Sequence, residues 1–182
     1  MPALPEQFDP AQVNAPSFDR LPDIPAIQLL KSRRQWVAWK YDDRGGPKPT
    51  KPPISPQTGF KASHSEPKHW GDYNDAVTRV VRSGLEGVGY VLTEDDNLSG
   101  GDLDHCRNAE TGELEPWAAE IVALAETYVE VSPSGEGLRI LWLGKVADAI
   151  KCDPAGVEVY GRQRYLTITG DHLAGTPAEI RE

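Results

Sequence analysis

The fold is decided by one stretch of the chain, residues 128–140, which has the sequence Tyr-Val-Glu-Val-Ser-Pro-Ser-Gly-Glu-Gly-Leu-Arg-Ile. Two runs rich in β-branched and other apolar residues flank a turn of serine, proline and glycine, which is the pattern of strand, tight turn and strand. Strands joined by so short a turn pair in antiparallel fashion, since a parallel crossover needs about a dozen residues or more. The stretch therefore predicts an antiparallel hairpin.

The rest of the chain predicts more short strands of this kind and three helices. Helices are expected from Ile24 to Arg34, after Asp72 as N-cap, and from Pro116, which suits the first turn of a helix. Further strands are expected at residues 35–41, 88–93, the segment that leads into Asp102, 127–132, 138–143, 157–160 and 165–169. Because the spacings are short, we predict an α+β fold with a mainly antiparallel sheet and helices on one side.

Three segments lie outside this pattern. Residues 1–25 are rich in proline and polar groups and predict a mobile arm, which leaves residues 26–182 as the folded domain. Residues 42–59 contain five prolines, so they cannot continue a sheet ladder, and a loop of that length is more often functional than a simple connection. Residues 175–182 resemble the start of a further helix, which predicts an isolated domain of a longer protein.

Length and composition exclude several classes of protein. The 182 residues are enough for one domain with a hydrophobic core, and no apolar run approaches the length of a membrane-spanning helix. The first residues lack the charged and apolar regions of a secretion signal. Two cysteines are too few for a disulfide framework. We therefore expect a cytoplasmic protein with free thiols and no contact with a membrane.

Charge is divided unevenly along the chain. The net charge of −9 argues against a nucleic-acid partner, but residues 31–69 contain nine Lys or Arg against three Asp or Glu. Residues 86–131 contain twelve acids and one arginine. This division predicts a basic flank beside an acidic centre, so that a polyanion can lie on the first and be processed at the second. Two solvated faces of opposite sign would give the same counts.

Three carboxylates are the candidate metal ligands. Asp102 and Asp104 are two residues apart on a predicted strand, so their side chains share a face. Two like charges held side by side are costly unless a cation lies between them, and a hard divalent ion such as Mg²⁺ or Mn²⁺ prefers oxygen ligands. Glu158, on a neighbouring predicted strand, supplies a third acid, although an exposed strand face would also explain it. Acids of this kind can hold two metal ions for phosphoryl transfer.

Residues near these acids are candidates to bind phosphate groups. In the turn of the hairpin, Gly135 and Gly137 allow backbone N–H groups to approach an anion, and Ser134 adds a hydroxyl donor. Arg139 and Arg164 can grip a phosphate with their planar guanidinium groups. An ordinary β-turn, and arginines that only pair with the nearby acids, are the competing interpretations.

Two further groups of residues have weaker patterns. Lys48 and Lys51, in the proline-rich loop, are candidates to bind the phosphates of a nucleotide or of a template strand, although scattered surface lysines look the same. His105, Cys106 and His172 lack the usual ligand spacing of a zinc site, so no zinc is expected.

Taken in order, these motifs resemble the archaeo-eukaryotic primase superfamily, and most closely the primase–polymerase domains of phages, prophages and plasmids. The likeness spans roughly residues 33–172. The motifs are Trp-Val-Ala-Trp at 36–39, Lys-Pro-Thr-Lys-Pro-Pro at 48–53, Asp-Leu-Asp at 102–104, Ser-Pro-Ser-Gly-Glu-Gly at 132–137, Val-Glu-Val-Tyr at 157–160 and Arg-Tyr-Leu-Thr-Ile-Thr-Gly at 164–170. Each motif is short, but their order and spacing together are fairly specific.

The resemblance implies a fold, an activity and a site. The fold is an RNA-recognition-motif-like sheet with flanking helices and an N-terminal α/β portion. The activity is template-directed nucleotidyl transfer from nucleoside triphosphates to a 3′-hydroxyl. Asp102, Asp104 and Glu158 match the family's acids for two Mg²⁺ or Mn²⁺ ions. Many members have histidine where this chain has Arg139, and because arginine keeps a permanent charge we expect phosphate binding to survive the change.

The resemblance also implies partners and a setting. The expected partners are a single-stranded DNA template, a primer, nucleoside triphosphates, and a C-terminal helical or helicase domain outside this chain. The expected setting is the cytoplasm of a bacterial host, with the protein encoded by a phage or another mobile element.

Two alternative functions remain open from the sequence. The first is a catalytically weak or inactive relative that only binds single-stranded DNA or nucleotide, which the arginine at position 139 and the negative charge leave open. The second is another Asp-x-Asp metal enzyme, such as a nuclease or a sugar-nucleotide transferase. A nuclease would cut DNA with metal and no nucleotide, and a sugar transferase would bind nucleoside diphosphate sugars.

Overall fold

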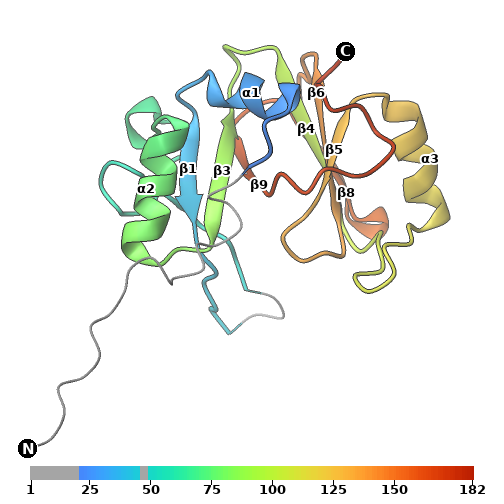
Figure 1. The fold of residues 1–182 in the computed structure, drawn as a ribbon, viewed down its shortest axis with the longest axis horizontal. Coiled ribbons are helices and arrows are strands. Elements are labelled where there is room, and N and C mark those ends of the chain that lie inside the picture. Colours follow the sequence, from blue (N-terminus) through green and yellow to red (C-terminus); the bar gives the residue numbers. More distant parts are fainter. Residues whose placement is uncertain (1–20, 46–48) are drawn as a thin grey trace, which may run out of the picture.

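Two antiparallel sheets and three α-helices make up the part of the chain that the computed structural model describes, residues 21–45 and 49–182 (Figure 1). The helices are α1 (Pro25–Lys31), α2 (Tyr73–Ser83) and α3 (Pro116–Ala125), with the short 3-10 helices η3 (Pro67–His69) and η4 (Asp153–Ala155). The strands are β1 (Trp36–Trp39), β2 (Pro53–Ile54), β3 (Gly87–Leu92), β4 (Leu98–Leu103), β5 (Tyr128–Val131), β6 (Leu138–Leu143), β7 (Ile150–Cys152), β8 (Val157–Tyr160) and β9 (Arg164–Ile168). Most of the predicted N-terminal arm, and Lys48, lie outside the described residues.

The first sheet has the strand order β2-β1-β3-β9. β1 pairs with β2 and β3, and β3 pairs with β9 so that Val88 lies opposite Ile168. α2 covers this sheet beside β1, and its Ala76 and Val80 join a core cluster with Trp36 (Figure 1). The side chains of β1 are buried on both faces, as the apolar sequence of that strand predicts.

The second sheet has the strand order β5-β6-β4-β8-β7. β5 and β6 form the predicted hairpin, with Val131 opposite Leu138 across the turn. α3 lies at the far end of the molecule from α2, and its Ala118 packs with Val129 and Ile140 in a second core cluster (Figure 1). The hairpin that decided the fold is therefore confirmed.

The two sheets meet where β4 passes β9. Gly100 of β4 has no side chain, and a Cβ atom at this position would overlap the side chain of Leu166 in β9. Leu166 also packs in the cluster that contains Leu98 and Leu141. The close approach at Gly100 brings β9 of the first sheet next to the β4 residue two places further on, Asp102.

Most predicted elements are present, and four details differ. The strand spacing alone predicted one sheet, whereas the structure divides the strands between two, with helices packed against each. The proline-rich loop was expected to stay out of any ladder, but it contributes β2, whose two residues pair with β1. β7 was not predicted, and α1 ends at Lys31. Cys106 and Cys152 are free thiols, as expected.

Residues 175–182 contain turns and bends but no helix, so the helix start predicted there is wrong. The residues just before them, 171–173, pair with the free edge of β5: the Val131 N–H donates to the Asp171 carbonyl at 2.8 Å, and the Leu173 N–H donates to the Val129 carbonyl at 2.9 Å. Residues 171–173 thereby satisfy backbone groups that an open sheet edge would leave unpaired. Further on, Ile180 is buried in the core, and the Leu143 N–H of β6 donates to the Arg181 carbonyl at 2.7 Å.

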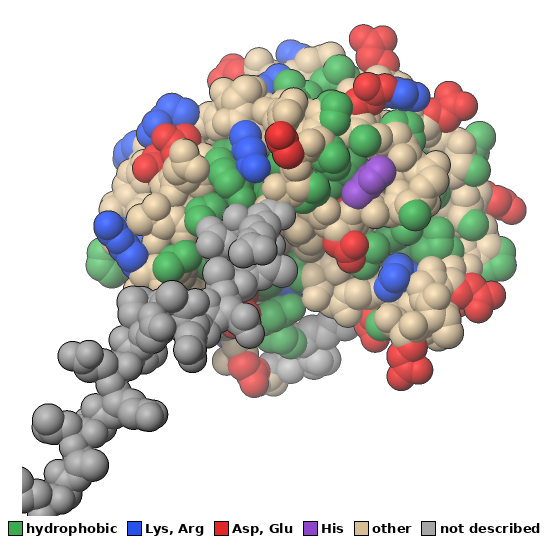
Figure 2. Space-filling model, viewed as in Figure 1, with side chains coloured by type: hydrophobic (Ala, Val, Ile, Leu, Met, Phe, Trp, Pro, Cys, Tyr) green, Lys and Arg blue, Asp and Glu red, His purple; other side chains and the backbone are tan. Residues whose placement is uncertain are grey.

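On the face that Figure 2 shows, the charged side chains are unevenly distributed. Figure 2 shows acidic side chains along the edge that α3 occupies in Figure 1, and most of the basic ones in that view towards the side of α2. Among residues 21–45 and 49–182, no helix has the length and apolar character needed to cross a membrane.

Candidate active site

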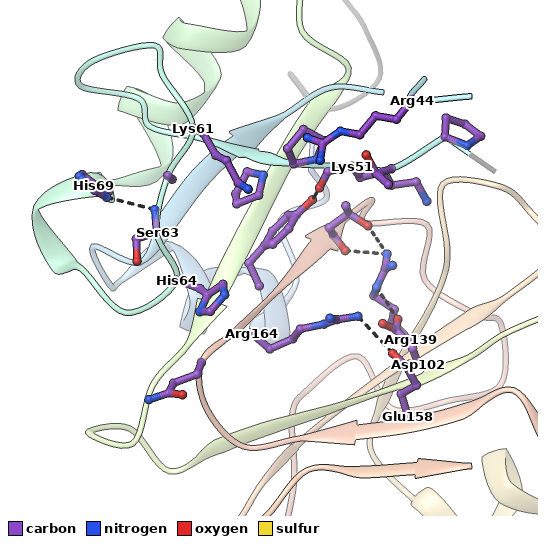
Figure 3. A pocket seen from close by; sticks show the side chains of 18 of the residues that line it. Arg44, Lys51, Lys61, Ser63, His64, His69, Asp102, Arg139, Glu158 and Arg164 are labelled. Carbon is purple, nitrogen blue, oxygen red and sulfur yellow. Dashed lines mark hydrogen bonds and ion pairs between the residues drawn. The ribbon is translucent and has the colours of Figure 1, made fainter. Parts of the chain in front are cut away.

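A pocket of about 870 Å³ lies between the two sheets and contains the predicted acids. Asp102, Asp104 and Glu158 line it, together with Arg139 and Arg164. Figure 3 labels Asp102, Glu158 and the two arginines. These residues come from the ends of β4, β6, β8 and β9, so the meeting of the two sheets places them together. With Lys51, which also lines the pocket, the structure gathers six of the predicted site residues in one cavity.

Five charged residues form a row across the second sheet. Their positions are directly opposite one another on neighbouring strands: Glu130 on β5, Arg139 on β6, Asp102 on β4, Glu158 on β8 and Lys151 on β7. Opposite residues of paired strands share one face of the sheet. Exposure rises along the row, from Glu130, which is fully buried, to the side chain of Lys151, which is 51% exposed. The row thus leads from the core to the solvent through the candidate metal ligands.

Arg139 lies at the buried end of the pocket and connects the two sheets. Its Nε is 2.8 Å from Oδ1 of Asp102, and the two side chains are 9% and 15% exposed. Its Nη1 donates to the carbonyl of Thr167 in β9 at 2.8 Å and also to the Thr167 hydroxyl (Figure 3). These contacts fix the guanidinium group of Arg139 between Asp102 of one sheet and Thr167 of the other.

Glu158 is held by cations at the more exposed end. Arg164 Nη2 is 3.1 Å from one carboxylate oxygen and Lys151 Nζ is 3.3 Å from the other, while the Tyr160 hydroxyl donates to Glu158. Burial acts to raise the pKa of Glu158, but the hydrogen bonds from Tyr160 and Lys151 and the charge of Arg164 together hold it below its usual value. Glu158 is therefore ionised at neutral pH.

Asp104 lies just past the end of β4, so its place differs from the prediction. β4 ends at Leu103, and Asp104 is exposed in the following turn, where its N–H donates to the Gly156 carbonyl at 2.8 Å. Asp102 and Asp104 nevertheless line the same pocket. Although the chain leaves the sheet after Leu103, Asp104 stays in the same pocket as the other two acids.

The three acids fit a hard divalent cation by donor type, since all are carboxylates. They do not form a finished cage. Within residues 21–45 and 49–182, no three His, Cys, Asp or Glu side chains are gathered closely enough to hold one ion. What the described residues provide is a facing pair, Asp102 and Glu158, whose charges are balanced by cations of the chain, and Asp104 beside it.

The opposite wall of the pocket is basic and comes from the first part of the chain. Arg44, Lys51 and Lys61 line it, with His64 and His69 (Figure 3). The sequence predicted a basic flank beside an acidic centre, and the pocket brings the two together. Lys51 lines the cavity, and its role in binding phosphates stays a prediction, while Lys48 lies outside the described residues.

The Ser/Gly turn does not line the pocket but adjoins it. Ser134 shares a hydrogen bond with the Ser132 hydroxyl at 3.0 Å, and the Gly135 carbonyl accepts from Arg107 at 2.8 Å. A Cβ atom at Gly137 would lie 2.7 Å from the Leu103 carbonyl, so glycine allows the turn to pack against the end of β4. The phosphate-binding role of Ser134, Gly135 and Gly137 stays a prediction.

Sequence reasoning missed three residues of the site. Glu130, Lys151 and Thr167 contact or extend the charged row. Glu130 and Lys151 belong to none of the motifs named above, and Thr167 lies in the motif at 164–170 without having been assigned a role. The sequence did contain a signal for Glu130. If the two strands of the hairpin pair across the six-residue turn at 132–137, residue 130 lies opposite residue 139. Thr167 had no such signal, because it belongs to the other sheet.

Comparison with known proteins bears on the family of the chain. No family model matches the chain. The sequence is 39% identical, over 158 residues, to a DNA primase-polymerase of Nitratiruptor phage NrS-1. The chain is a homologue of this phage primase-polymerase. The resemblance stated from the motifs is thereby confirmed.

The match differs in extent between the two proteins. It includes 84% of this chain but 21% of the phage primase-polymerase, so the chain spans about a fifth of the length of that relative. The pocket acids and arginines lie in the part of the chain, residues 33–172, that showed the motif likeness.

Proposed function

We propose that this chain is a primase–polymerase catalytic domain that transfers nucleotides from nucleoside triphosphates to the 3′-hydroxyl of a DNA primer, as directed by a template. The observation that most supports the proposal is a single pocket with three carboxylates and two arginines on one side and a basic wall on the other. The homologue, named as a primase-polymerase, favours the same activity.

Each part of the pocket has a proposed role. Asp102, Asp104 and Glu158 would hold Mg²⁺ or Mn²⁺, which when bound lowers the pKa of an attacking hydroxyl and neutralises charge on the leaving group. Arg139 and Arg164 bind and orient the phosphates of the incoming nucleotide, because a guanidinium offers paired donors to phosphate oxygens.

The basic wall is proposed to hold the nucleic acid. Arg44, Lys51 and Lys61 face the cavity from the side opposite the acids, so a template strand bound there would lie across from the nucleotide. Attraction between lysine or arginine and backbone phosphates is independent of sequence and weakens as salt is added. Binding to single-stranded DNA should therefore fall steeply between low and moderate salt.

A second candidate is a domain that binds nucleotide or single-stranded DNA without catalysis. The pairing of Asp102 with Arg139 favours it, since a carboxylate already neutralised by the chain is less available to a metal ion. A nuclease is a further possibility for paired acids, and the experiment below separates all three. A helical or helicase partner, and a role in replication of a phage or mobile element, are also proposals that rest on the resemblance.

The test is primer extension on a short DNA template with Mg²⁺ or Mn²⁺ and all four nucleoside triphosphates. Asp104→Ala is the informative variant, because Asp104 is exposed and its loss should leave the fold intact. We expect extension to slow on the order of 100-fold or more, as when a group that stabilises transition-state charge is removed.

Glu120→Ala is the matched control, since Glu120 is an exposed acid on α3 away from the pocket. Full extension by Asp104→Ala would refute the assignment of the site. DNA shortened by metal without nucleotide would identify a nuclease, and binding without extension would identify the non-catalytic domain.

A further inference from the structure

We propose that Arg139 is a built-in counter-ion that occupies the cation side of Asp102, so that a divalent cation and a phosphate group bind this site cooperatively. The inference rests on the proposed function, because it assigns both ligands to the same pocket. It concerns this chain's own residues: each ligand, binding alone, must separate Arg139 from Asp102.

The contact between the two residues is close and shielded from water. Nε of Arg139 is 2.8 Å from Oδ1 of Asp102, and the side chains are 9% and 15% exposed. Opposite charges attract more strongly where little water screens them. Removing one partner of such a pair leaves the other charge poorly compensated. A cation that approaches Asp102 therefore competes with Arg139.

Arg139 is also fixed from the other sheet. Its Nη1 donates to the carbonyl and the hydroxyl of Thr167, so β9 holds the guanidinium towards Asp102. The neighbouring acid is held differently: Lys151 and Arg164, the cations at Glu158, have side chains 51% and 40% exposed. Pairs that solvent reaches are weak and easily exchanged. Asp102, not Glu158, is therefore the acid whose release controls the site.

The cooperativity follows because both ligands require the same ion pair, Arg139 with Asp102, to be separated, and this separation costs free energy. A phosphate that takes Arg139 frees Asp102 for a cation, and a cation that takes Asp102 frees Arg139 for a phosphate. When both ligands bind, the ion pair is separated only once. By linkage, each ligand must then raise the affinity of the other by the same factor, and couplings of this kind are typically about 5-fold to 150-fold.

The first experiment measures metal binding without phosphate. The 182-residue chain is titrated with Mn²⁺, and free Mn²⁺ is followed by its electron paramagnetic resonance signal. Arg139→Gln should bind Mn²⁺ roughly 5-fold or more tightly than wild type, because Asp102 is released. Arg162→Gln is the matched control, since Arg162 pairs with Glu94 at 3.0 Å outside this pocket and should leave the affinity unchanged.

The double variant Asp102→Asn, Arg139→Gln identifies the acid responsible. It should lose the gain, because the released carboxylate is gone. Equal Mn²⁺ affinity in wild type and Arg139→Gln, or a gain that survives in the double variant, would overturn the proposal.

The second experiment measures phosphate binding without metal and does not require a variant at the buried arginine. Inorganic tripolyphosphate is titrated calorimetrically in EDTA. Asp102→Asn should bind it roughly 5-fold or more tightly than wild type, since Arg139 no longer has a competing partner. Asp104→Asn removes the same charge from the same pocket, but the ion-pair partner of Arg139 is Asp102, so Asp104→Asn is the matched control. An equal gain in both variants, or none in Asp102→Asn, would overturn the proposal.

Neither experiment uses DNA or turnover, so the result of each does not depend on whether the proposed polymerase activity is present. Affinity shifts in a chain that never extends a primer would refute the polymerase and keep the ion-pair mechanism. Extension by a chain that shows neither shift would refute the mechanism alone.

Discussion

At the scale of single residues, Glu130 is the least expected member of the site. Its carboxylate is fully buried and accepts hydrogen bonds from the Tyr128 hydroxyl at 2.9 Å and from the Thr169 and Gly170 N–H groups at 3.0 Å. It lies opposite Arg139 in the sheet. Glu130 thus connects β5 to the residues that follow β9, next to the strand that holds Arg139.

The environment of Glu130 predicts an unusual pH dependence of stability. Burial raises the pKa of Glu130, although its backbone hydrogen bonds and the charge of Arg139 oppose the change. Between the ordinary pKa and the raised one, the folded chain binds a proton that the unfolded chain does not. Stability then falls as pH rises through that interval.

We expect Glu130→Gln to remove this decline. The free energy of unfolding, measured with urea from about pH 4.5 to 8, should fall less with rising pH in the variant, by about 1.4 kcal/mol for each unit of pKa shift. Glu120→Gln, on the exposed face of α3, should follow the wild-type curve. Parallel curves for wild type and Glu130→Gln would contradict the raised pKa.

The sequence identified the candidate site residues at this scale better than the residues that contact them. Asp102, Glu158 and Arg139 stand in recognisable motifs, and the structure places them on neighbouring strands. Glu130 was missed because an acid between Val129 and Val131 looks like the solvent side of a strand. In the folded chain that side is interior, because β5 pairs with β6 and Glu130 accepts hydrogen bonds from Thr169 and Gly170, which follow β9.

At the scale of elements, α2 is the one whose start the sequence defines best. Asp72 accepts a hydrogen bond from the Asp75 N–H at 2.9 Å, and Asp75 accepts one from the Asp72 N–H at 3.2 Å, which is a capping box. Gly84 ends the helix with φ of 58°, a left-handed conformation that favours glycine. These signals are local, so the sequence alone was sufficient.

Asp72→Ala should therefore destabilise the protein by about 1 kcal/mol, the usual effect of losing an N-cap. Asp72→Ser should retain most of the stability, because a serine hydroxyl also accepts from the first turn. The measurement is urea unfolding at neutral pH. Asp72 also pairs with Arg34 at 3.1 Å, but both side chains are largely exposed, so Arg34→Ala should cost less than about 0.5 kcal/mol. An equal loss in Arg34→Ala would assign the effect to the ion pair.

The two shortest strands, β2 and β7, could not be predicted from the local sequence. β2 consists of Pro53 and Ile54 and pairs with β1, and β7 is an exposed edge strand of three residues. Neither has a hydrophobic repeat long enough to be recognised, since two or three residues do not establish a period. Both exist because a neighbouring strand offers unpaired backbone groups.

At the scale of the whole molecule, the division into two sheets could not be predicted. It depends on pairings between distant segments, such as β3 with β9, which hairpin spacing does not reveal. The counts of charge did predict the outcome of that division: a basic wall from residues 44–69 faces the acids of β4 and β8 across one pocket. Long-range strand pairing decides where the pocket lies, and the charged residues of the paired segments decide that one wall is basic and the other acidic.

The junction of the sheets gives a prediction with a control one residue away. A Cβ atom at Gly100 would overlap Leu166 and lie 3.1 Å from Leu141, and both leucines are buried in the core. Gly100→Ala should therefore cost about 1–3 kcal/mol, as overpacking does. At Gly101, whose Cβ would point to the other face, the nearest atom is 3.5 Å away, an ordinary contact.

Gly101→Ala should accordingly be neutral or stabilise the protein by up to about 1 kcal/mol, because alanine restricts the unfolded chain. Urea unfolding of the two variants at the same pH measures the difference. Since Asp102 lies in β4 two residues after Gly100, the strain caused by Gly100→Ala should also slow primer extension, while Gly101→Ala should leave its rate close to that of wild type. Equal stability of the two variants would mean that β4 and β9 are not packed as closely as described, and that contact between the sheets does not hold the acids in position.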